Sequence, residues 1–187
     1  MPTNRAGIDE WMDRASSGDD RAFGALASAV QDELFRFALA LGLGREDAAE
    51  VTQEVLMRAY AGRSTWKGGS DAMAWLCGIA VNVAREYHRK ERRRQAAWLD
   101  PTWRQASGEA GPGGPSWKEG PDPDQLRRLV EAVAELPSRQ REAIACRYLR
   151  RMSIKETAEA MGCAEGTVKS AVSAALERLR DIMDQHR

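Results

Sequence analysis

The sequence contains little cysteine and little histidine. Among its 187 residues are 3 cysteines and 2 histidines, with no C-x-x-C pair and no histidine at a metal-ligand spacing from a cysteine. These features argue against a disulfide framework and against a zinc site, and we predict neither a metal nor a cofactor. We expect the three cysteines to be small, reduced hydrophobic residues of a cytoplasmic protein.

Long hydrophobic runs are also missing. Residues 1–20 hold no apolar segment of the signal-peptide type, and no stretch approaches the roughly 18 apolar residues of a membrane span. Two-residue alternation, the pattern of half-buried strands, is absent as well. We therefore expect a soluble, all-α protein without a membrane span, whose 43% hydrophobic residues suffice for one ordinary core or two small ones.

The net charge of zero conceals a segregated charge distribution. Residues 1–80 carry 8 basic and 12 acidic side chains, and residues 100–124 carry 2 and 5. The two basic blocks are residues 81–99, with 6 basic and 2 acidic side chains, and residues 125–187, with 12 and 9. A polyanion such as DNA is expected to bind at these two blocks.

Helical spacing of apolar residues runs through most of the chain. Phe23, Leu26, Val30, Leu34, Phe37 and Leu41 recur every three or four residues and predict a helix over about 20–41. The stretch around Trp11 is either a regulatory contact or the start of this helix, and we favour the second interpretation. The same spacing predicts helices over about 46–61, 72–94, 138–150 and 166–183, and a short helix that Pro137 stops, with Ser138 as the expected N-cap of the helix that follows.

Residues 100–124 interrupt this pattern, because they hold 5 of the 7 prolines and 5 of the 16 glycines without any periodicity. This composition predicts a linker over 98–123 between a helical domain of residues 1–97 and a second of residues 124–187. Such a linker spans about 25–30 Å on average and stretches to roughly 80–90 Å. We expect the free protein to be compact.

The segment SIKETAEAMGCAEGTVKSAVSAALERLR (153–180) has the pattern of a helix–turn–helix. Ser153 and Glu156 form a capping box, and Ala158 and Gly162 provide the small contact residue and the left-handed turn that the motif requires. Its second helix would present Thr167, Lys169, Ser170 and Ser173 to base edges and Arg178 to phosphate. The alternative is an ordinary helical hairpin. Alanines at positions 171, 174 and 175 predict weak DNA binding by this module alone.

Two further segments accompany this motif, namely DAAEVTQEVLMRAY (47–60) and WKGGSDAMAWLCGIAVNVAREYHRKERRR (66–94). With LPSRQREAIACRYLRRMSIKETAEAMGCAEGTVKS (136–170), they give residues 22–180 a layout that resembles the extracytoplasmic-function class of bacterial sigma factors. The resemblance implies two small helical domains, region-2-like and region-4-like. It also implies three partners: core RNA polymerase (the coiled coil of its largest subunit and its flap region), promoter DNA and an anti-sigma factor.

By this resemblance, the 47–60 helix docks on polymerase. Its exposed acidic face suits a basic partner surface, although the family pattern usually has a further acid where Ala49 stands. The expected polymerase-binding residues are Asp47, Glu50, Gln53, Glu54 and Arg58.

The 66–94 segment would read and melt the −10 promoter element, with a pocket for an unstacked base beside Gly68 and Gly69. We expect Trp66 to touch DNA and Trp75 to lie in the core. The expected −10 contacts are Trp66, Lys67, Ser70, Asp71, Asn82, Arg85, Arg89 and Lys90.

Two other functions are compatible with parts of the sequence. A helix–turn–helix regulator would bind duplex DNA without polymerase, but the recognition helix has few basic residues for that task. An enzyme would need catalytic groups, and we find no nucleophile–base pair, metal cluster or phosphate-binding glycine loop. We expect a non-enzymatic protein with no catalytic residues.

Overall fold

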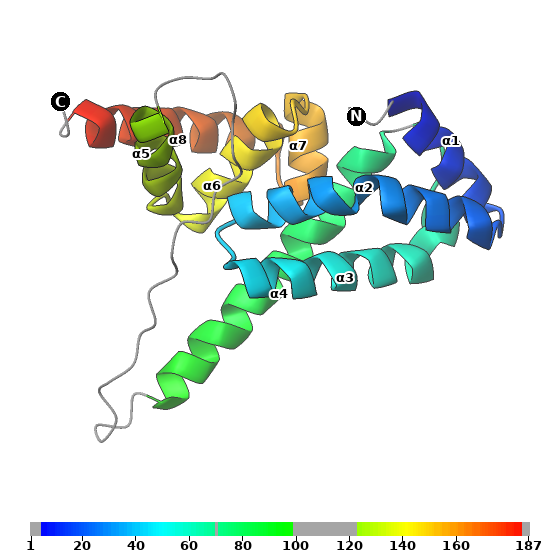
Figure 1. Ribbon diagram of the computed structural model, residues 1–187. Coiled ribbons are helices and arrows are strands. Elements are labelled where there is room, and N and C mark those ends of the chain that lie inside the picture. The colour runs from blue at the N-terminus through cyan, green and yellow to red at the C-terminus, as the bar shows by residue number, and fades with distance from the viewer. Residues whose placement is uncertain (1–4, 70, 99–122, 185–187) are drawn as a thin grey trace.

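The computed structural model describes residues 5–69, 71–98 and 123–184, and every regular element in these ranges is a helix (Figure 1). Residues 99–122 of the expected linker lie outside the described residues. The N-terminal unit comprises α1 (Arg5–Ser16), α2 (Asp20–Ala40), α3 (Arg45–Gly62), the short 3-10 turn η1 (Arg63–Thr65) and α4 (Ala72–Trp98). The C-terminal unit comprises α5 (Pro123–Ala134), α6 (Ser138–Ile144), the π-helical turn η2 (Ala145–Leu149), α7 (Ile154–Met161) and α8 (Glu165–Asp184).

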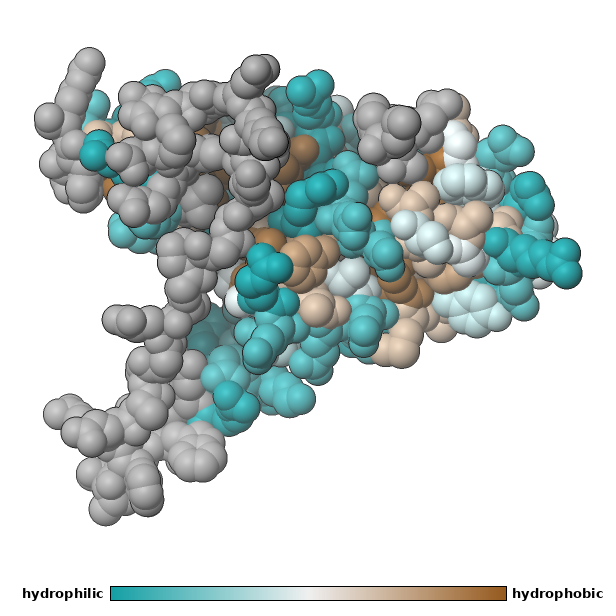
Figure 2. Space-filling model, in the orientation of Figure 1, coloured by the Kyte–Doolittle hydropathy of each residue, from teal (hydrophilic) through white to brown (hydrophobic). Residues whose placement is uncertain are grey.

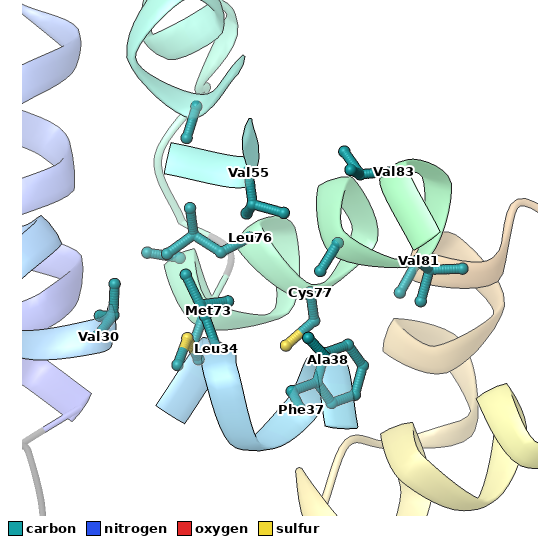
Figure 3. Close-up of a cluster of buried hydrophobic side chains, with 14 of the residues drawn as sticks. Val30, Leu34, Phe37, Ala38, Val55, Met73, Leu76, Cys77, Val81 and Val83 are labelled. Carbon is teal, nitrogen blue, oxygen red and sulfur yellow. The ribbon is translucent and has the colours of Figure 1, made fainter. Parts of the chain in front are cut away.

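The main core lies where α2, α3 and α4 meet. The apolar stripe predicted for α2 is buried along its whole length, from Phe23 to Leu41. Figure 3 shows side chains of this stripe beside Val55 of α3 and Leu76 of α4. Burial of this shared stripe is the main force that holds the three helices together.

The N-terminal stretch around Trp11 is a helix of its own, so the prediction that it begins the 20–41 helix was wrong. Gly18 has φ +100°, a left-handed conformation that ends α1 and turns the chain. Asp19 then caps α2, since its side chain accepts a hydrogen bond from the backbone N–H of Ala22 over 3.0 Å.

The C-terminal unit contains the predicted helix–turn–helix, but the helix before it differs from the prediction at both ends. Pro137, not Ser138, occupies the N-cap position of α6, and no side chain caps this helix. The expected helix to position 150 also stops early as an α-helix, because the backbone widens into η2, where the N–H of Arg150 bonds the carbonyl of Ala145.

The two units pack against each other through α4 and α7. A Cβ built on Gly78 of α4 would lie 3.4 Å from the Cα of Ala160 of α7, so the helices approach closely at these small residues. Cys146 and Met152 of the C-terminal unit join the main core. The protein is therefore compact, in agreement with the expectation from the linker length.

The second half of α4 projects from this compact body (Figure 1). On the face that Figure 2 shows, the coloured side chains of the projecting part are hydrophilic. Its exposed basic residues are Arg89, Lys90, Arg92, Arg93 and Arg94.

Candidate functional site

The outward face of α3 carries the residues predicted to bind polymerase. Glu50 and Gln53 are exposed, whereas Asp47 and Glu54 are half-buried. The hydroxyl of Tyr87 on α4 donates a hydrogen bond to Asp47, so this carboxylate also links the two helices.

Met57 continues this face and is 60% exposed, although the sequence reasoning did not single it out. Its position one turn beyond Gln53, on the face opposite the buried stripe, was the available signal. An exposed methionine among polar groups gives the face an adaptable apolar contact.

Arg58 ties α3 to α4. Its guanidinium donates to Glu54 over 2.7 Å and to both carboxylate oxygens of Glu86 over 3.0 and 2.7 Å. The hydrogen bonds to Glu86, and to a smaller extent the one to Glu54, raise the pKa of Arg58. The bonds from Arg58 in turn lower the pKa of Glu86. Arg58, predicted to bind polymerase, is thus engaged within the unit.

Trp66 is buried instead of open to DNA, whereas Trp75, predicted to lie in the core, packs against the core and is partly buried. Trp66 is only 7% exposed, and its indole N–H donates to Asp13 of α1 over 2.7 Å. Trp75 is half-buried and packs edge-to-face on Trp66, with ring centroids 5.9 Å apart. A direct contact of Trp66 with DNA does not fit this burial. Burial of the indole is possible because Asp13 of α1 accepts the hydrogen bond from its N–H group.

Asp71, predicted to contact DNA, caps α4. Its carboxylate accepts from the backbone N–H groups of Met73 over 2.8 Å and Ala74 over 3.1 Å. These donors have no partner inside the helix, so the carboxylate satisfies them and stabilises the start of α4. Lys67 is exposed, and Ser70 lies outside the described residues.

Asn82 is exposed on α4 and lines a cleft of about 800 Å³ between the two units. Trp75 and Arg89 line the same cleft from α4, and Arg139 and Glu142 line it from α6. An amide can hydrogen-bond a base edge, an aromatic ring can stack on a base, and a guanidinium can contact phosphate.

Arg85, predicted to contact DNA, is bound to the C-terminal unit. Its guanidinium donates two hydrogen bonds to Glu142 and a third, of 3.0 Å, to the carbonyl of Met161. The bonds to Glu142 raise the pKa of Arg85 against the opposing effect of burial. Arg89 and Lys90, one turn further along α4, are exposed.

The helix–turn–helix is formed by α7 and α8. The capping box of Ser153 and Glu156 is present, with bonds of 3.1 and 2.6 Å, and Gly162 has φ +61° in the turn. Ala158 and Val168 are buried together where the helices touch. The predicted reading residues all lie exposed on α8: Thr167, Lys169, Ser170, Ser173 and Arg178.

Neither a membrane-spanning helix nor a metal centre is found in the described part of the chain. None of its helices is both long enough and apolar enough to cross a bilayer. No three His, Cys, Asp or Glu side chains within residues 5–69, 71–98 and 123–184 are grouped to hold a metal ion.

Comparison with known families and proteins follows the division into two units. The family model for Sigma-70 region 2 matches residues 26–94, and that for Sigma-70, region 4 matches residues 126–179. The chain is 31% identical over 155 residues to the ECF RNA polymerase sigma factor EcfG of Rhodopseudomonas palustris, covering 83% of this chain and 81% of that protein. It is 29% identical over 173 residues to the RNA polymerase sigma-H factor of Pseudomonas aeruginosa, covering 90% and 89%.

The fold also matches a solved sigma factor structure. The sigma factor RpoE, crystallised with the anti-sigma factor NepR from Bartonella quintana, superposes with a TM-score of 0.63 and 29% identity, over 84% of this chain and 94% of that one. The order of the two units, the helix–turn–helix and these similarities all indicate the same family. The chain belongs to the ECF RNA polymerase sigma factors, the initiation factors that direct RNA polymerase to promoters.

Proposed function

We propose that residues 1–97 bind core polymerase and read the −10 element, that residues 98–123 are a linker, and that residues 124–187 read the −35 element. The observation that carries this proposal is the pair of helices α4 and α8. Each buries an apolar face in its unit and exposes polar groups suited to nucleic acid. Two such helices on separate units fit a protein that reads two sites.

The polymerase-binding surface is the outward face of α3. The exposed Glu50 and Gln53 form its polar part, and Met57 adds an apolar contact. Asp47 and Glu54 border this face and complete an acidic stripe for the basic coiled coil of the largest subunit. Ala49, also exposed, leaves the stripe one acid short of the usual family pattern.

The −10 element is read at the cleft beside α4. Asn82 hydrogen-bonds a base edge, Trp75 offers a ring for stacking, and Lys67, Arg89 and Lys90 contact phosphates. This assignment gives Trp75 the role first expected for Trp66. Arg85 joins these contacts only when its bonds to Glu142 are broken.

The −35 element is read by the N-terminal part of α8 in the major groove. Lys169 and Ser170 face base edges together with Thr167 and Ser173, and Arg178 contacts phosphate. The shortage of basic residues on this helix makes the affinity depend on polymerase, because phosphate contacts supply most of the binding free energy.

The protein acts in the cytoplasm, where polymerase and chromosomal DNA are found, and it has no catalytic role of its own. An anti-sigma factor is a further partner, because a related sigma factor was crystallised with one.

Run-off transcription with purified core polymerase and a pool of genomic promoter fragments tests this function. We expect starts that depend on the protein and share two sequence elements. Asn82→Ala should reduce open-complex formation and leave polymerase affinity unchanged. Reversing the charges of Asp47 and Glu50 should weaken polymerase binding, and replacing Lys169 and Ser170 by alanine should impair upstream recognition.

Leu129→Ala provides a matched control, because Leu129 is a half-exposed residue outside the three surfaces. Binding of duplex DNA without polymerase, and no transcript with it, would instead establish a regulator. Equal loss of open complexes and polymerase affinity in Asn82→Ala would remove Asn82 from the −10 surface.

A further inference from the structure

Two acidic residues of α1 face the chain segment that leads into α4. The carboxylate of Asp13 accepts a hydrogen bond from the indole N–H of Trp66 over 2.7 Å. The carboxylate of Asp9 accepts one from the backbone N–H of Ala72 over 2.8 Å. Asp9 and Asp13 are four residues apart, so they project from the same face of α1.

The helix that carries these carboxylates is itself fixed to the core. Ile8, Met12 and Ala15 of α1 are all buried against the rest of the N-terminal unit. The positions of the two carboxylates are therefore set by the packing of α1 and not by a mobile chain end.

Residues 66–69, which Asp13 contacts, include two glycines in succession. Gly68 and Gly69 have φ values of +68° and +69°, a conformation that glycine adopts readily. Because glycine also adopts many other conformations, these two residues do not by themselves fix the backbone. A Cβ built on Gly68 would lie 3.4 Å from Oδ1 of Asp13, so the backbone passes close to this carboxylate. Asp13 thus binds the segment at Trp66 and lies close to its backbone at Gly68.

At the other end of the segment, the start of α4 is fixed twice. Asp71 accepts from the N–H groups of Met73 and Ala74, and Asp9 from that of Ala72. Three donors that helix geometry leaves unpaired are therefore satisfied, one of them from α1. The bond from Ala72 to Asp9 therefore ties the first turn of α4 to α1.

The family match assigns no role to this arrangement, because the Sigma-70 region 2 model begins at residue 26, beyond the end of α1. We propose that Asp9 and Asp13 are positioning residues for promoter reading, which hold residues 66–69 and the start of α4 in the conformation that receives the melted strand. This inference rests on the proposed function of the α4 surface.

The physical gain is preorganisation. A segment with two adjacent glycines that ordered only on binding DNA would lose conformational entropy at that step and bind more weakly. Hydrogen bonds from a packed helix order the segment beforehand. The effect should fall on discrimination between bases at the −10 element, and the affinity for polymerase should be unaffected.

The experiment compares Asp13→Ala, Asp13→Asn and Glu10→Ala in the full-length protein. Asparagine keeps an acceptor for the Trp66 N–H, and Glu10 is an exposed acid on α1 that serves as the matched control. The readouts are open-complex formation on promoters with substituted −10 bases, affinity for core polymerase, thermal unfolding, and amide hydrogen exchange of residues 66–74.

We expect Asp13→Ala to lower open-complex formation on the best promoter about tenfold, the order of effect of one hydrogen bond to a charged group, and to reduce discrimination between bases. Exchange of residues 66–74 should become faster, while polymerase affinity stays within about twofold of wild type. Asp13→Asn should retain most of the activity, and Glu10→Ala should match wild type.

Equal discrimination by Asp13→Ala and Glu10→Ala would overturn the inference. So would a loss of all activities, polymerase affinity included, that parallels a lower unfolding temperature, because Asp13 would then only stabilise the fold. Absence of transcription with the wild-type protein would instead refute the proposed function. In that case unchanged exchange in Asp13→Ala would also refute the positioning role.

Discussion

Arg85 of α4 donates two hydrogen bonds, of 2.9 and 2.6 Å, to the carboxylate of Glu142 of α6, and this pair joins the two units. Glu142 thus binds the guanidinium that the sequence analysis predicted to contact DNA. A phosphate would have to compete with Glu142 for Nε and Nη2 of Arg85, so the compact arrangement opposes that contact with DNA.

Removing Arg85 should loosen the contact between the units. Arg85→Ala leaves the buried carboxylate of Glu142 without its main partner, with an expected cost of about 2–4 kcal/mol to the packed arrangement. Small-angle scattering should show a larger radius of gyration. Arg92→Ala, an exposed arginine of the same helix, is the control, and an unchanged radius in Arg85→Ala would contradict the prediction.

Gly78 should tolerate a methyl group and no more. A Cβ at this position meets Ala160 at 3.4 Å, an ordinary contact, so Gly78→Ala should keep the units packed and gain up to about 1 kcal/mol from helix propensity. Gly78→Leu should separate α4 from α7. Gly24→Leu is the control, because a Cβ at Gly24 meets nothing within 4 Å. Scattering and thermal unfolding measure both effects, and a compact, stable Gly78→Leu protein would refute the prediction.

The three cysteines should differ in reactivity. Burial raises the pKa of the Cys77 thiol well above its usual range and raises that of Cys146 to about 12, whereas Cys163 is only partly buried. Since the thiolate is the reactive form, alkylation at neutral pH should modify Cys163 first. Cys146 lies in the core that the two units share, so it should become reactive in a variant whose units separate, such as Gly78→Leu. Mass spectrometry of the labelled peptides follows each site, and equal rates at all three would contradict the packing.

Tyr87 should stabilise the N-terminal unit in a pH-dependent way. Its hydrogen bond to Asp47 is the main cause that raises the pKa of Tyr87 from 10.0 to about 12. Because the folded-state pKa is the higher one, the stabilisation is complete below pH 10 and is lost as the pH rises through about 12. Tyr87→Phe should lower the unfolding free energy by about 1 kcal/mol at neutral pH.

The difference between Tyr87→Phe and wild type should shrink above pH 10, as denaturant unfolding at several pH values would show. Tyr148→Phe is the control, because Tyr148 is 57% exposed. A difference between Tyr87→Phe and wild type that stays constant to the highest pH would indicate that the Tyr87 hydroxyl does not act through Asp47.

Local sequence determined the long helix α2 and the turn of the helix–turn–helix. The spacing of Phe23 through Leu41 places one face of α2 inward whatever it packs against, because a 3.6-residue period leaves no other arrangement. The capping box of Ser153 and Glu156 and the left-handed Gly162 depend on neighbours within five residues. The same local signals, in their order along the chain, indicated the family.

Only the tertiary structure decided which polar and aromatic groups remain available to a partner. Trp66 donates to Asp13, 53 residues earlier in the chain, and Arg85 donates to Glu142, 57 residues later. Only folding brings these partners together. Spacing along one helix predicts a shared face, but it does not predict what another helix brings to that face. The physical reason is that such groups are paired by packing of the core, whose geometry is fixed only when all the helices are in place.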